Sequence, residues 1–158
     1  RDDYWRQGSV CEDYAAIKAA VYCIGGWGDA YKNSVPRLMQ HLNGPKKALL
    51  GPWIHKYPHF AVPNPAIGFL QEAKRWWDHW LKGIDNGVMD EPACTFYLQD
   101  AVPPKASYAE RPGVWVQTAG IAAPPEELFR LAGPLGAAGV RRFGGFWGVM
   151  GLLVGGSM

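Results

Sequence analysis

Cysteine is scarce in this sequence, and the copies present follow no metal-binding or disulfide pattern. The 158 residues include three cysteines, Cys11, Cys23 and Cys94, an odd number without CxxC spacing. Neither a disulfide framework nor a zinc knuckle is therefore expected. His55 and His59 have i, i+4 spacing, but the proline between them disfavours the helix that would align both for a metal. We expect no metal site.

An excess of one charge is also lacking. The 16 Lys and Arg residues against 14 Asp and Glu residues give a formal charge of +2, with no long basic run. This excludes a strongly basic nucleic-acid surface. Neither G-x-x-x-x-G-K-[ST] nor G-x-G-x-x-G occurs, so nucleotide binding has no support and no cofactor is expected. The apolar end, residues 143–158, is shorter than the roughly 20 residues of a membrane helix and rich in glycine, so membrane attachment is not expected.

Apolar and aromatic residues are plentiful. Hydrophobic residues make up 48% of the chain, aromatic residues 13% and charged residues 19%, which is enough to bury a core. The chain opens on Arg rather than Met and shows no signal peptide, so we expect a piece of a longer protein. The compartment is left open, with the cytoplasm favoured.

The first part of the chain predicts an α/β fold. Residues 20–24 form an apolar run stopped by two glycines, residues 34–42 have a helical pattern, and residues 46–50 form a second apolar run. A strand, a helix and a strand with short links are typical of a βαβ unit in a parallel sheet. Residues 66–82 predict a longer helix with one apolar face, which we interpret as core packing.

After the long helix the pattern changes. Residues 94–98 and 114–116 are β-rich and linked by a proline-rich segment, which predicts the opening of a separate all-β unit. We divide the chain into residues 1–90, residues 91–139 and a glycine-rich apolar tail, residues 140–158, expected to be disordered or misread.

An acid and a histidine follow two neighbouring predicted strands. Asp29 lies in the run GGWGD directly after the first strand, and His55 lies in GPWIH directly after the second. Open parallel sheets place working groups on loops at the carboxyl ends of their strands, so these side chains can meet. A carboxylate that accepts from one imidazole nitrogen leaves the other nitrogen free to act as a base. Read separately, Asp29 could be a turn aspartate and His55 a satisfied polar residue under a loop.

A nucleophile to complete a triad is missing. The G-x-S-x-G elbow does not occur, and Ser9 lies in Gln7-Gly8-Ser9-Val10 without the second glycine or a preceding strand. Cys23 falls inside a predicted strand and is expected to pack in the core. We therefore expect the nucleophile of any triad to lie upstream of Arg1.

Four residue runs resemble the cocaine esterase/X-Pro dipeptidyl-peptidase-like serine hydrolases over residues 1 to about 116. They are Asp3-Tyr4-Trp5, Gly26-Trp27-Gly28-Asp29, Gly51-Pro52-Trp53-Ile54-His55 and Arg75-Trp76-Trp77-Asp78-His79-Trp80-Leu81-Lys82-Gly83. The resemblance implies that Asp29 and His55 are the acid and base of a Ser-His-Asp triad. It also implies the C-terminal part of an α/β-hydrolase parallel sheet, followed by the truncated start of a jelly-roll-like β-domain at residues 91–139.

These observations predict a fragment of a serine hydrolase that cleaves ester, amide or X-Pro peptide bonds by acyl transfer, inactive without its serine. The expected partner is a small-molecule ester, amide or peptide substrate, and homo-oligomer formation is left open. Trp27, Trp53 and Tyr57 are the candidate substrate-contacting residues. In the alternative interpretation, a non-catalytic binding or interaction module, the same aromatic side chains form an exposed stacking surface.

Overall fold

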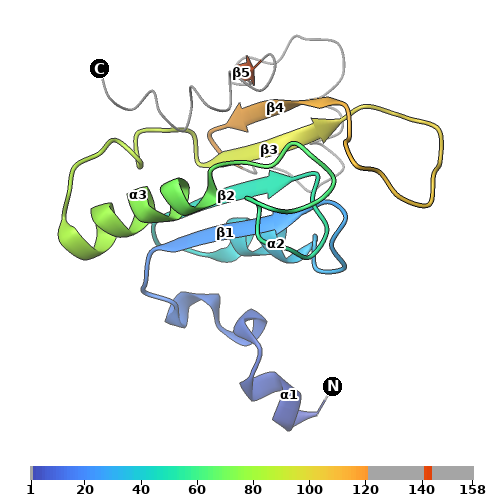
Figure 1. The fold of residues 1–158 in the computed structure, drawn as a ribbon. Coiled ribbons are helices and arrows are strands. Elements are labelled where there is room, and N and C mark those ends of the chain that lie inside the picture. Colours follow the sequence, from blue (N-terminus) through green and yellow to red (C-terminus); the bar gives the residue numbers. More distant parts are fainter. Residues whose placement is uncertain (1, 121–140, 144–158) are drawn as a thin grey trace.

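The computed structural model describes residues 2–120 and 141–143 (Figure 1). The first residues form helix α1 and two short 3-10 turns, before the main body begins at residue 21. The elements in chain order are α1 (Asp3–Gln7), η1 (Val10–Glu12), η2 (Tyr14–Ala16), β1 (Val21–Gly26), α2 (Ser34–His41), β2 (Lys46–Gly51), α3 (Phe69–Lys82), β3 (Cys94–Gln99), β4 (Gly113–Thr118) and β5 (Arg141–Phe143). Within the described residues, no helix is both long and apolar enough to cross a membrane.

The strands form one mixed sheet in the order β1-β2-β3-β4-β5. β1 pairs in parallel with β2 from Val21↔Lys46 to Gly26↔Gly51, and β2 pairs in parallel with the start of β3. β4 and β5 then add antiparallel strands. The α/β character and the parallel βαβ unit predicted from the sequence are confirmed.

Alternate residues of the strands pack into two cores on opposite faces of the sheet. One core joins Cys23 and Ala48 to the α2 residues Val35 and Met39. The other lies on the α3 side, where Tyr22 packs its ring 5.2 Å from that of Trp76. Figure 1 accordingly shows α3 in front of the sheet and α2 behind β1. The result is a three-layer arrangement, with the carboxyl ends of β1 and β2 at one edge.

A network of charged side chains fixes α3 to the sheet. Lys47 on β2 donates to Glu91 at 2.6 Å, and Arg75 on α3 donates to the other Glu91 oxygen at 2.5 Å. Arg75 also contacts Glu72, whose carboxylate accepts from the Tyr22 hydroxyl at 2.8 Å. The side chains of Lys47 and Glu72 are only 4% and 5% exposed. These charges satisfy one another inside the layer, as buried charges must.

The long helix differs from its prediction in start and in burial. It begins at Phe69, with Gly68 as its N-cap in a non-helical conformation, and residues 66–68 stay outside the helix. Its buried residues include Ala73 and Trp76, whereas the apolar residues of the neighbouring row are exposed: Leu70, Trp77 and Leu81. The expectation of one wholly buried apolar face is wrong for this row, because no described element covers it.

The later strands also differ from expectation. Residues 94–98 were expected to open a separate all-β unit, but β3 continues the sheet of β1 and β2, with Ala48↔Cys94 in parallel register. The residues that pair β2 with β3 are buried on both strands. The backbone N–H and C=O groups along this edge of β2 therefore find their hydrogen-bond partners in β3. Of the tail expected to be disordered, residues 140–158, Arg141–Phe143 form β5, while residue 140 and residues 144–158 lie outside the described residues. Residues 121–139, the later part of the expected β-domain, also lie outside them. A jelly-roll-like domain at residues 91–139 stays a prediction.

Candidate active site

The loop that carries Asp29, residues 27–33, follows β1 and is called the acid loop here. It begins with a tight turn at the end of β1. The amide of Asp29 donates to the carbonyl of Gly26 at 3.1 Å, which closes a tight turn. The carboxylate oxygen Oδ1 of Asp29 accepts from the amide of Tyr31 at 2.8 Å. One oxygen of the carboxylate is thereby held by the backbone, and Oδ2 is left to contact another group.

The histidine loop, residues 52–68, follows β2 and is anchored by Trp53. The Trp53 side chain is 1% exposed, and its Nε1 donates to the carbonyl of Pro65 at 2.8 Å. The next amide, that of Ile54, donates to the carbonyl of Val62 at 2.8 Å. Two residues after the anchor, His55 projects from this closed loop.

The two loops interlock through backbone contacts that require glycine. The amides of Trp27 and Gly28 donate to the carbonyls of Gly51 and Trp53, each at 2.9 Å. A Cβ at Gly26 would lie 2.0 Å from the Trp53 carbonyl oxygen, and a Cβ at Gly51 would lie 2.4 Å from the Trp53 ring. A side chain at Gly26 would push the loops apart, and one at Gly51 would displace the Trp53 ring.

The interlocked loops bring Asp29 and His55 together. The Nδ1 atom of His55 lies 2.7 Å from Oδ2 of Asp29, so the contact predicted from the two strand ends is present. The Asp29 side chain is 12% exposed and that of His55 is 78% exposed. An ionised carboxylate only accepts hydrogen bonds, so we assign the Nδ1 proton to the imidazole, which leaves Nε2 available.

Hydrogen bonds to the charged carboxylate control its ionisation. The Tyr31 amide, and then the His55 ring, hold the pKa of Asp29 below its usual range. Because both donors favour the charged form, Asp29 stays ionised in neutral solution and faces the imidazole as an anion. Such a carboxylate orients the ring and stabilises it when it becomes protonated.

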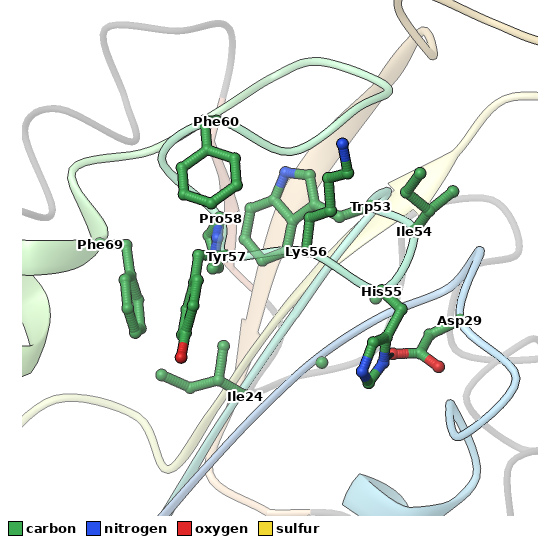
Figure 2. A pocket seen from close by; sticks show the side chains of 12 residues that line it. Ile24, Asp29, Trp53, Ile54, His55, Lys56, Tyr57, Pro58, Phe60 and Phe69 are labelled. Carbon is green, nitrogen blue, oxygen red and sulfur yellow. Dashed lines mark hydrogen bonds and ion pairs between the residues drawn. The ribbon is translucent and has the colours of Figure 1, made fainter.

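A cavity of about 480 Å³ opens beside the pair (Figure 2). Its wall is mostly apolar and aromatic, and the Tyr57 ring stands between those of Phe69 and His55 in the view of Figure 2. The lining residues are Ile24, Gly25, Gly26, Asp29, Trp53, Ile54, His55, Lys56, Tyr57, Pro58, Phe60 and Phe69. The described lining contains no serine, threonine or cysteine that could serve as the nucleophile.

The three aromatic residues predicted to contact substrate occupy different environments. Tyr57 is 62% exposed and lines the cavity. Trp53 touches the cavity but is buried, and Trp27 packs against the core and donates from Nε1 to the carbonyl of Tyr97 at 2.7 Å. They do not form the exposed stacking surface of the alternative interpretation.

Three residues of the site were missed by the sequence analysis. Tyr31 supplies the amide that holds Asp29, and Phe60 and Phe69 line the cavity. The signal for Tyr31 was present, since an aspartate commonly accepts from the amide two residues later. Phe69 was assigned to the helix core by its spacing alone. In the part of the chain that the structure describes, no group of three His, Cys, Asp or Glu side chains could hold a metal ion.

Comparison with known proteins shows similarity to hydrolases. The sequence pattern of the X-Pro dipeptidyl-peptidase (S15) family matches residues 1–57, a range that includes both Asp29 and His55. This part of the chain is thus similar to that family. A Bacillus cereus protein that carries the name Xaa-Pro dipeptidyl-peptidase is 29% identical over 105 residues, covering 58% of this chain and 16% of its own length. A Mycobacterium bovis protein that carries the name serine esterase is 29% identical over 120 residues, covering 66% of this chain and 18% of its own length.

The fold is also that of a solved hydrolase. A CocE/NonD family hydrolase from Staphylococcus aureus matches 78% of this chain and 20% of its own, with a TM-score of 0.56 and 17% identity. The resemblance to the cocaine esterase and X-Pro dipeptidyl-peptidase hydrolases is thus confirmed. The chain spans about a sixth of the length of the curated relatives that it matches.

Proposed function

We propose that this chain carries the acid and the base of an acyl-transfer hydrolase, and that the nucleophilic serine comes from another part of the protein. The observation that carries the proposal is the 2.7 Å contact between His55 Nδ1 and Asp29 Oδ2 at the ends of adjacent parallel strands. The names of the relatives, a dipeptidyl-peptidase and a serine esterase, support the same reaction type. The same geometry supports the roles proposed for Asp29 and His55.

His55 acts as the general base and then as the general acid. Its Nδ1–H is donated to Asp29, so Nε2 carries the lone pair that takes the serine proton as the hydroxyl attacks the substrate carbonyl. The imidazolium that forms is stabilised by the ionised Asp29 and returns its proton to the leaving group. In the second half of the reaction Nε2 activates a water molecule, which releases the acyl group and restores the serine.

The substrate is a small ester, amide or peptide bound in the cavity beside His55. The exposed ring of Tyr57 and the side chains of Phe60 and Phe69 offer it an apolar wall. An X-Pro peptide is one such substrate, in keeping with the name of the Bacillus cereus relative. Trp27 and Trp53 contribute little contact area, because one packs against the core and the other is buried.

The first experiment concerns the chain by itself. We expect purified chain to show no saturable hydrolysis of nitrophenyl acetate, because acid and base without a nucleophile form no acyl-enzyme. In the same sample, the His55 ring should show an Nδ1-bound proton in its NMR spectrum that disappears in Asp29→Asn. Saturable turnover that is lost in His55→Ala would show that the chain holds a nucleophile and would overturn that part of the proposal.

The second experiment concerns the protein that also carries the serine. Asp29→Asn should lower kcat by on the order of 10⁴, because the asparagine favours the wrong imidazole tautomer. His55→Ala should lower it at least as much. The matched control is Asp78→Asn: its side chain is also 12% exposed and also hydrogen-bonded, here to Lys74 and Lys82, but it lies on α3 outside the cavity. Equal losses in Asp29→Asn and Asp78→Asn would argue against a triad role.

A further inference from the structure

Tyr97 on β3 contacts the acid loop through its backbone. The parallel ladder between β2 and β3 ends at Leu50↔Phe96, so the carbonyl of Tyr97 lies just beyond the ladder. This carbonyl accepts from Nε1 of Trp27 at 2.7 Å. Trp27 lies two residues before Asp29, in the turn that presents the acid.

The hydroxyl of the same tyrosine reaches the histidine loop. It donates to the carbonyl of Arg111 at 2.9 Å, and the amide of Arg111 donates to the carbonyl of Asn64 at 3.0 Å. Asn64 is two residues after Val62, whose carbonyl accepts from the amide of Ile54 beside the histidine. Three hydrogen bonds, joined by short stretches of backbone, thus link Tyr97 to the residue before His55.

The Tyr97 ring supports the anchor of the histidine loop. Its centroid lies 5.2 Å from that of Trp115, which in turn lies 5.9 Å from that of Trp53. The side chain is 6% exposed, and burial raises the pKa of Tyr97, so the hydroxyl stays protonated and remains a donor. Carbonyl, hydroxyl and ring of one residue therefore act on both loops of the site.

We propose that Tyr97 is a positioning residue, which fixes the acid loop against the histidine loop and so sets the contact between Asp29 and His55. Tyr97 acts on the acid loop through Trp27 and on the histidine loop in part through Trp53. These tryptophans thereby have a role other than substrate contact. The proposal rests on the proposed function for its effect on turnover. Its effect on the geometry of the pair can be measured in the chain itself.

The substitution Tyr97→Phe removes the hydroxyl and keeps the ring and the carbonyl. In ¹⁵N spectra of the His55 ring, we expect the ratio of the Nε2-protonated to the Nδ1-protonated tautomer to rise roughly two- to fivefold, as part of the contribution of one hydrogen bond is lost. Trp27→Phe removes the indole N–H that Tyr97 accepts and should shift the ratio in the same direction. The second variant leaves β3 itself unchanged, so it keeps the test informative if Tyr97→Phe folds poorly.

The matched control is Tyr22→Phe. This tyrosine is also largely buried and also donates a hydrogen bond, to Glu72 at 2.8 Å, but it contacts neither loop through that hydroxyl. We expect Tyr22→Phe to leave the tautomer ratio at the wild-type value, even if it lowers stability. An unchanged ratio in both Tyr97→Phe and Trp27→Phe, or an equal shift in Tyr22→Phe, would overturn the positioning role.

Turnover in the protein that carries the serine separates this inference from the proposed function. Tyr97→Phe should lower kcat several-fold with little change in KM, and it should have no further effect in an Asp29→Asn background, where the contact is already lost. If Tyr97→Phe shifts the tautomer while Asp29→Asn leaves kcat intact, the proposed function fails and the positioning role stands. Additive losses in the double variant would show that Tyr97 acts independently of the Asp29–His55 contact and would overturn the inference.

Discussion

At Gly26 the acid loop and the histidine loop approach so closely that no side chain fits between them. The Trp53 carbonyl occupies the space that a Cβ would need, and the same carbonyl accepts from the amide of Gly28. The loops are therefore held by main-chain atoms rather than by long side chains. This arrangement fixes the small distance between Asp29 and His55 at little cost in side-chain entropy.

Gly26→Ala should lower the free energy of unfolding by about 1–3 kcal/mol, because the new methyl group must displace the Trp53 backbone. Urea unfolding followed by tryptophan fluorescence measures the change. The control is Gly44→Ala, where the nearest atom to the new Cβ is a carbonyl oxygen at 3.7 Å, an ordinary contact. A similar midpoint in urea for the two variants would contradict the close approach at Gly26.

Among single residues, Asp29 and His55 could be predicted because their signal is local. Each follows an apolar run that ends in glycine, and strand ends in a parallel sheet share one edge. Trp27 and Trp53 could not be assigned in the same way. The indole N–H of Trp27 is satisfied by a carbonyl 70 residues away, and nothing in the sequence near Trp27 indicates that partner.

Among the elements, α3 depends most on charged groups inside the layer. Glu91 accepts from both Lys47 and Arg75, and it joins the segment before β3 to β2 and α3 at once. The helical spacing of residues 66–82 predicted that this helix exists and where it ends, but not its start or its exposed apolar row. The charge network could not be predicted, because its members are far apart in sequence and read individually as solvated surface charges.

Glu91→Gln should lower the free energy of unfolding by about 3 kcal/mol, because it leaves Lys47 and Arg75 without a full counter-charge in a buried place. We take the lower end of the range for buried pairs since the Glu91 side chain is 20% exposed. Lys74→Met is the control: Lys74 also pairs with an acid, Asp78, but is 72% exposed, so we expect a loss below about 1 kcal/mol. Chemical unfolding of both variants tests the difference. Equal losses in the free energy of unfolding would show that the buried network stabilises the fold no more than an exposed ion pair does.

In the molecule as a whole, the sequence predicted the βαβ core but not the return of β3 to the same sheet. An apolar run such as residues 94–99 has the same local pattern whether it joins β2 or opens another sheet. What decides the pairing is the open edge of β2, 46 residues earlier at Ala48↔Cys94. Only the packed structure shows that edge.

The three cysteines report on the cooperativity of this sheet. Cys11 is exposed, whereas Cys23 on β1 and Cys94 on β3 are 5% and 2% exposed, and burial raises the pKa of Cys23 to about 11. At pH 8 without denaturant, we expect Ellman's reagent to modify one thiol rapidly. The other two should react only as fast as the sheet opens, and together, because β1 and β3 flank the same strand. Rapid reaction of all three in native buffer would contradict a cooperative five-stranded sheet.

The acid and the base of the site belong to one supersecondary unit, β1-α2-β2, and lie 26 residues apart in the chain. Their meeting requires the closure of a short loop only, so the pair can assemble as soon as that unit folds. Tyr97 lies 42 residues beyond His55 and joins later, when a longer segment closes on the sheet. We therefore expect the pair to form during local folding and to reach its final alignment only when β3 joins the sheet.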